Sequence, residues 1–118
     1  MRRAIIAGLV IVLAASTAAA TAQTNGFDKI EARYAIIGKN LTDPGPNEKK
    51  DRAAFFVSGA GAKKIYEAMP GKSKKGVCSE TDQIKMNGNL ACSRDGNAYS
   101  CSVAVMLKSG ASASAFVC

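Results

Sequence analysis

The positions of the four cysteines constrain the fold of this chain more than any other feature of its sequence. All of them lie in the last third of the chain, at Cys78, Cys92, Cys101 and Cys118. No two of them have the Cys-x-x-Cys spacing of a zinc site, and the chain contains no histidine, so metal binding is disfavoured. We therefore expect two disulfides, which form and persist in an oxidising compartment.

The N-terminal residues have the order of a secretory signal. Arg2 and Arg3 precede an apolar run over residues 4–15, and residues 20–22 (Ala-Thr-Ala) fit a signal-peptidase site. This order predicts a cleaved signal peptide at residues 1–22 and a single small domain at 23–118, either periplasmic or secreted. The alternative is an uncleaved membrane anchor. The apolar run is short and rich in alanine, which favours cleavage and a mature form without an integral membrane span.

Turn signals divide the last third of the chain into strands. Asn87-Gly88, Asp95-Gly96 and Ser109-Gly110 are each suited to a tight hairpin turn, because Asn, Asp and Gly tolerate a positive φ. The clearest strand lies before the third turn, where apolar side chains alternate with small polar ones. Its predicted apolar face carries Tyr99, Cys101, Val103, Val105 and Leu107.

The same turns bear on the disulfide pairing. A two-residue turn at Ser109-Gly110 would place Cys101 directly opposite Cys118 and leave Cys78 to pair with Cys92. The rival pairing joins Cys92 to Cys101 and Cys78 to Cys118, and it requires the second turn to lie at Gly96-Asn97. We favour the pairs Cys78–Cys92 and Cys101–Cys118.

The rest of the domain is predicted to supply one helix and further strands. Residues 27–37 fit both the helical and the strand period, and we favour a strand, since Tyr and Ile are good strand formers. Residues 38–51 are predicted to form a loop and 53–58 a buried strand. A helix is expected over 58–69, with Ser58 as its N-cap and an apolar stripe of Ile65, Tyr66 and Met69.

These elements predict an α+β fold, in which an antiparallel β-meander of about five strands carries one α-helix on one face and is stapled by disulfides. The helix stripe should meet the apolar face of the 99–107 strand.

Net charge adds an expectation about partners. The chain has 16 basic and 9 acidic residues, a formal net charge of +7, so an acidic protein face or an anionic envelope component is a suitable partner. Nucleic acid is disfavoured, because the basic segment lacks interleaved aromatic residues that would stack on bases. The candidate binding residues are five lysines around the helix and its exit: Lys63, Lys64, Lys72, Lys74 and Lys75.

The sequence offers little for catalysis. Without histidine the Ser–His and Cys–His arrangements are excluded, and carboxylate pairs such as Glu48 with Asp51 or Glu80 with Asp82 lie in polar, turn-rich segments. We therefore expect no enzymatic activity and no cofactor. In size, export signal and cysteine content the chain resembles small exported bacterial proteins, among them periplasmic lysozyme inhibitors and toxin-immunity proteins, without a motif of any one family.

Three functional hypotheses remain. The first is an exported non-enzymatic binding or inhibitor-type protein, with the 38–51 loop and the lysines as its surfaces. The second is a basic factor that binds anionic envelope or membrane surfaces, and the third is a small hydrolase.

Overall fold

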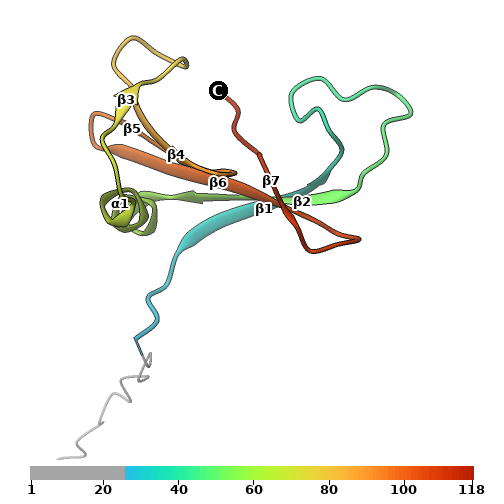
Figure 1. Ribbon diagram of the computed structural model, residues 1–118, viewed down its shortest axis with the longest axis horizontal. Coiled ribbons are helices and arrows are strands. Elements are labelled where there is room, and N and C mark those ends of the chain that lie inside the picture. Colours follow the sequence, from blue (N-terminus) through green and yellow to red (C-terminus); the bar gives the residue numbers. More distant parts are fainter. Residues whose placement is uncertain (1–25) are drawn as a thin grey trace, which may run out of the picture.

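The computed structural model describes residues 26–118 as a seven-stranded antiparallel sheet with one helix (Figure 1). The strand order is β1-β2-β6-β5-β4-β3, and β7 pairs with β6. The predicted α+β fold, with one helix on an antiparallel sheet, is confirmed. The predicted signal peptide lies outside the described residues. The elements are β1 (Glu31–Ile37), β2 (Arg52–Ser58), α1 (Gly59–Ala68), β3 (Lys74–Lys75), β4 (Gln83–Asn87), β5 (Leu90–Asp95), β6 (Ala98–Met106) and β7 (Ser112–Ala113).

Strand β1 resolves the ambiguity of residues 27–37 in favour of a strand. All seven of its residues pair with β2, from Glu31 opposite Ser58 to Ile37 opposite Arg52. The loop predicted over residues 38–51 follows it. Within the described residues, no helix is long and apolar enough to cross a membrane.

Helix α1 begins directly after β2 and ends before Pro70, which cannot continue it. Ser58 holds the N-cap position in an extended conformation, but its side chain makes no capping hydrogen bond. The predicted N-cap position is therefore right, but Ser58 lacks the side-chain hydrogen bond that an N-cap serine usually makes. At the other end, the Met69 N–H donates to the Ile65 carbonyl at 3.0 Å.

The two hairpin turns in the meander lie one residue later than predicted. Asn87 pairs with Leu90, and Asp95 pairs with Ala98, so the turn residues are Gly88-Asn89 and Gly96-Asn97. Glycine takes the first turn position in both cases, with φ of +58° and +59°. The two stretches read Asn87-Gly88-Asn89 and Asp95-Gly96-Asn97. Because Asn, Asp and Gly all accept a positive φ, either dipeptide of each stretch suits a tight turn.

This shift decides the first disulfide. With the turn at Gly96-Asn97, Cys92 lies directly opposite Cys101, and the two are bonded with their Cα atoms 4.0 Å apart. Cys78 is bonded to Cys118. The favoured pairs Cys78–Cys92 and Cys101–Cys118 are therefore wrong, and the rival pairing is the one that the structure contains.

The third turn is also longer than the two residues assumed. The Met106 N–H donates to the Ala111 carbonyl, and the Gly110 N–H donates to the Met106 carbonyl, so residues 107–110 form the turn. Strand β7 then pairs only at Ser112 and Ala113 and leaves β6 well before Cys118. Cys118 is consequently free to reach Cys78 with a Cα–Cα distance of 5.1 Å.

A separate core lies on each face of the sheet. On the helix side the buried residues are Ala62, Tyr66, Met69, Cys92 and Cys101, with Tyr99 packed against them. Tyr66 and Tyr99 meet edge to face at 5.5 Å between ring centroids.

On the opposite face, Ala54 and Ala104 pack against Ala115 of the C-terminal segment. Figure 1 shows this segment on the opposite side of the sheet from α1. The small side chains allow the segment to lie close to the sheet, and the Cys78–Cys118 bond fixes its end.

Candidate binding surface

The five predicted lysines do not form one cluster. On α1, Lys64 donates to Asp28 at 2.7 Å, and Lys63 lies 4.0 Å from Glu67, one helical turn away. The hydrogen bond between Lys64 and Asp28 raises the pKa of the lysine and lowers the pKa of the carboxyl. Both lysines of the helix are thus engaged at the surface, which favours a solvated helix face over a binding site.

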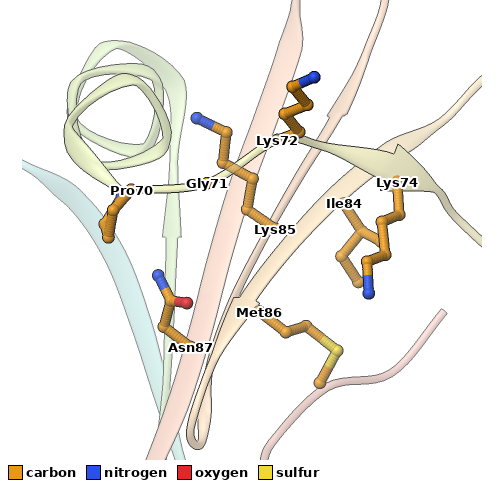
Figure 2. A pocket seen from close by; sticks show the side chains of 8 residues that line it. All are labelled: Pro70, Gly71, Lys72, Lys74, Ile84, Lys85, Met86 and Asn87. Atoms are coloured by element: carbon orange, nitrogen blue, oxygen red, sulfur yellow. The ribbon is translucent and has the colours of Figure 1, made fainter.

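The other three lysines lie together at the β3 edge. Lys72, Lys74 and Lys75 are exposed, and none of them forms an ion pair within residues 26–118. Lys72 and Lys74 line a cleft of about 350 Å³ beside Lys85 and Ile84 of β4 (Figure 2). We call Lys72, Lys74 and Lys75 the edge lysines.

Lys85 has a structural role that the sequence did not reveal. Its ammonium donates to the Tyr66 carbonyl at 3.0 Å and to the Met69 carbonyl at 3.1 Å. It also lies 4.8 Å from the centroid of the Tyr66 ring. These carbonyls are at the C-terminal end of α1, where the helix dipole attracts a cation. Lys85 therefore caps the helix from a neighbouring strand.

The 38–51 loop lies at the other end of the sheet from the edge lysines (Figure 1). It is anchored by Glu48, which accepts a hydrogen bond from the Asn40 N–H at 2.7 Å and packs against Gly38. The second carboxylate oxygen of Glu48 is buried without a hydrogen-bond partner in the described part of the chain. The two surfaces that the sequence suggested therefore do not converge.

A further exposed surface is apolar and lies on the helix-bearing face. In the register of the sheet, Tyr34 is opposite Phe55, which is opposite Val103. The next row of the same face joins Ile36, Ala53 and Val105. Alternate residues of a strand share a face, so both rows continue the row that contains Cys101, beneath the helix.

Much of this apolar surface is uncovered. Tyr34 is 72% exposed, Ile36 43% and Phe55 41%, while Val103 and Val105 are half-buried. These five residues are called the open apolar patch. Large apolar side chains that lie side by side on a sheet face are normally covered, so a contiguous exposed group of them is a candidate interaction site.

The open apolar patch stays uncovered because α1 crosses the strands. The helix has ten residues and crosses the strands instead of following them (Figure 1). A helix is about 10 Å wide and a strand rises about 3.3 Å per residue, so a crossing helix covers about three residues of each strand. The prediction that α1 meets the apolar face of β6 is right for Tyr99, which packs on the helix-side core. Val103 and Val105 are not part of that core.

Lysines border the open apolar patch beyond its β6 end. Leu107, 57% exposed, lines a cleft of about 430 Å³ together with Lys49, Lys50 and Lys108. Asp51 lines the same cleft, but its carboxylate is paired with Arg52. None of these lysines forms an ion pair within the described residues. An apolar surface with lysines at one end is complementary to a partner surface with apolar side chains flanked by carboxylates.

The carboxylates of the described residues do not assemble a catalytic or metal site. No group of three or more Cys, Asp and Glu residues within 26–118 is placed to hold a metal ion. Asp82 is only 3% exposed, contrary to the polar setting predicted for it, but it accepts from the Ser79 N–H at 3.3 Å within its own turn. Its second oxygen is buried against Gly76, without a hydrogen-bond partner in this part of the chain.

Asp95 completes this turn. It accepts hydrogen bonds from the Thr81 hydroxyl at 2.7 Å and the Ser79 hydroxyl at 3.0 Å, and these two bonds lower its pKa. The network joins the segment after Cys78 to the end of β5, so we interpret it as structural.

No protein-family model, curated protein or solved structure matched the chain. The surfaces described above are therefore the basis for any inference about function.

Proposed function

We propose that the mature chain is an exported, non-enzymatic binding or inhibitor-type protein that holds a protein partner on the open apolar patch. The observation that carries this proposal is the exposure of Tyr34, Ile36 and Phe55 beside half-buried valines on a sheet face. Tyr and Phe are frequent anchors of protein interfaces, because they bury a large area with few rotatable bonds. The lysines beyond Leu107 suit a partner with an acidic rim.

Two further properties support this proposal. The two intramolecular disulfides are consistent with an oxidising environment, as expected of an exported protein. The patch also lies on strands β1, β2 and β6, which are held rigidly by continuous antiparallel pairing. A rigid apolar surface loses little entropy when it binds, which suits a tight inhibitor.

Site-specific photocrosslinking in the exported protein tests this proposal. A photoreactive phenylalanine at Val103, a residue of the open apolar patch that lies away from the β1 edge, should yield a discrete adduct with an envelope protein, and the same group at Lys74 should not. Phe55 lies directly opposite Val103 in the sheet, and Phe55→Ser should weaken binding of the captured protein by about 30-fold, the usual effect of losing an aromatic anchor. Equal capture at both positions, or an unchanged affinity for Phe55→Ser, would contradict the proposal.

A second candidate function rests on the edge lysines. Three exposed lysines without ion pairs in the described residues could attract an anionic membrane surface by charge. The mature protein should then bind vesicles with anionic headgroups more than zwitterionic ones, and salt should weaken this binding. Replacing Lys72, Lys74 and Lys75 by Gln should abolish it, whereas no vesicle binding at low salt would exclude this candidate.

A further inference from the structure

Strand β1 is an open edge of the sheet. It is the first strand in the sheet order, so its outer backbone groups face no other strand within residues 26–118. Its seven residues pair with β2 without a bulge, and the strand contains neither proline nor lysine. Bulges, prolines and charged side chains, lysine above all, are the usual devices that prevent an edge from pairing with another chain. Strand β1 has no bulge and no proline, and its two charged side chains, Glu31 and Arg33, have opposite signs.

The charges of β1 are complementary to those of a second copy of the same strand. Antiparallel pairing about a two-fold axis at Ala32 places Glu31 of each copy directly opposite Arg33 of the other. Both side chains are exposed, and neither forms an ion pair in the described part of one chain. The pairing would therefore create two symmetric cross-strand ion pairs.

Neighbouring registers lack this match. An axis at Arg33 places the two arginines opposite each other, and an axis at Tyr34 places Arg33 opposite Ala35. Like charges directly opposite each other destabilise a strand pair. The charge pattern thus selects one register among the three.

The apolar residues agree with the same register. An axis at Ala32 places Ile30, which is 56% exposed, opposite Tyr34, which is 72% exposed. It also places Phe27, 80% exposed, opposite Ile37. The most exposed apolar side chains near β1 would each gain an apolar neighbour from the second copy.

From these observations we infer that two copies of this chain pair along residues 27–37, antiparallel and centred on Ala32. Strand β1 of each copy then lies opposite residues 27–33 of the other, which are the start of β1 and the segment before it, and the sheet is continuous across both molecules. The two-fold axis is perpendicular to the sheet, so both helices and both open apolar patches lie on the same side. The dimer presents two copies of the patch to a partner without covering Phe55 or Val103, which lie away from the β1 edge.

A charge-reversal cycle tests the dimer. Analytical ultracentrifugation of the mature protein should show a concentration-dependent dimer. Glu31→Arg and Arg33→Glu should each raise its dissociation constant about tenfold or more, because two attractive pairs become repulsive. The double variant Glu31→Arg/Arg33→Glu should restore dimerisation. Circular dichroism should be unchanged throughout, since both side chains are exposed.

A pair of cysteine variants tests the register. Ala32→Cys lies on the proposed axis, so its two copies should be close enough to form an intermolecular disulfide. Ala35→Cys is the matched control on the same strand, and its two copies should be about 20 Å apart. Crosslinking of the Ala32→Cys variant alone supports the register. A wild-type monomer at millimolar concentration, no recovery in the double charge variant, or equal crosslinking of both cysteine variants would each overturn the inference.

Discussion

The two edges of the sheet are built in opposite ways. β3 has two residues, both lysines, and it lies beside the turn held by Asp82 and Asp95. β1 has seven residues, and its only charges, Glu31 and Arg33, have opposite signs. A short, like-charged edge repels a second strand, whereas a long and nearly neutral edge accepts one.

The disulfides are distributed in the same asymmetric way. Both bonds lie on the side of β3 to β6 and the C-terminal segment, and neither includes a residue of β1 or β2. The open apolar patch extends over β1, β2 and β6, away from the edge lysines. The comparison indicates that one side of the molecule is a covalently fixed scaffold and that the other is available for binding.

Removal of the Cys92–Cys101 bond should have the largest effect on the scaffold side. Both cysteines are buried in the helix-side core, so Cys92→Ala/Cys101→Ala removes a crosslink and leaves a small cavity. We expect a loss of about 3–5 kcal/mol in the free energy of unfolding, measured by denaturant titration.

The matched control for this prediction is Cys78→Ala/Cys118→Ala, which removes a bond with an exposed partner, Cys118. Its cost should be about 2–4 kcal/mol. Peptide mapping of the non-reduced protein should recover the pairs Cys92–Cys101 and Cys78–Cys118. Recovery of a Cys78–Cys92 peptide would contradict the turns described at Gly96-Asn97 and at residues 107–110.

Gly76→Ala should have the next largest effect on stability, at the β3 edge. A β-carbon at position 76 would clash with the buried carboxylate of Asp82, and the Gly76 N–H donates to the Asp82 carbonyl at 2.9 Å. We expect a loss of about 1–3 kcal/mol in the free energy of unfolding. Gly45→Ala is the control, because a β-carbon there has no atom within 4 Å and should leave stability unchanged. Equal stabilities of the two variants would show that the Asp82 turn does not support β3.

Lys85→Met should weaken the attachment of α1 by a smaller amount. The variant keeps the length of the side chain but loses the hydrogen bonds to the Tyr66 and Met69 carbonyls. We expect a loss of about 1–2 kcal/mol in thermal or denaturant unfolding. Lys75→Met removes an exposed charge without such bonds and should have almost no effect. A loss of the same size in both variants would exclude a specific capping role.

Asp95 should produce the smallest effect, visible only through its pH dependence. Hydrogen bonds from Thr81 and Ser79 lower its pKa in the folded state, so its contribution is present above the pKa of an unfolded Asp, about 3.9. That contribution is lost as the pH falls through the lowered folded pKa. Asp95→Asn should therefore be less stable than wild type at about pH 6, and the difference should close below about pH 4. The control variant is Asp43→Asn, in the exposed loop.

Local patterns in the sequence predicted much of the scaffold. The alternation in residues 99–107 predicted β6, and the stripe of Tyr66 and Met69 predicted the buried face of α1. The disulfide pairing was not predicted, because it depends on a one-residue shift between Asp95-Gly96 and Gly96-Asn97, and both dipeptides suit a tight turn. The difference in turn preference between these two dipeptides is small, so the pairing of the whole hairpin decides which of them forms the turn.

The candidate surfaces were less predictable. The open apolar patch depends on the direction in which α1 crosses the strands, a tertiary property that the apolar alternation of β6 does not contain. Lys85 has the sequence pattern of an ordinary exposed strand residue, because its partners are carbonyl groups of a helix that precedes it in the chain. The edge position of β1 likewise follows from the insertion of β6 beside β2.

Hydrogen–deuterium exchange tests most directly whether β1 is the binding edge. The exchange rates of backbone amides in the mature protein should be compared at micromolar and at millimolar concentration. They should also be compared without and with the envelope protein that photocrosslinking captures. We predict that exchange slows in the peptide covering residues 27–37 and stays constant at Lys74 and Lys75. Slower exchange at β3 instead, or no change in β1 under either condition, would contradict the division between a binding side and a scaffold side.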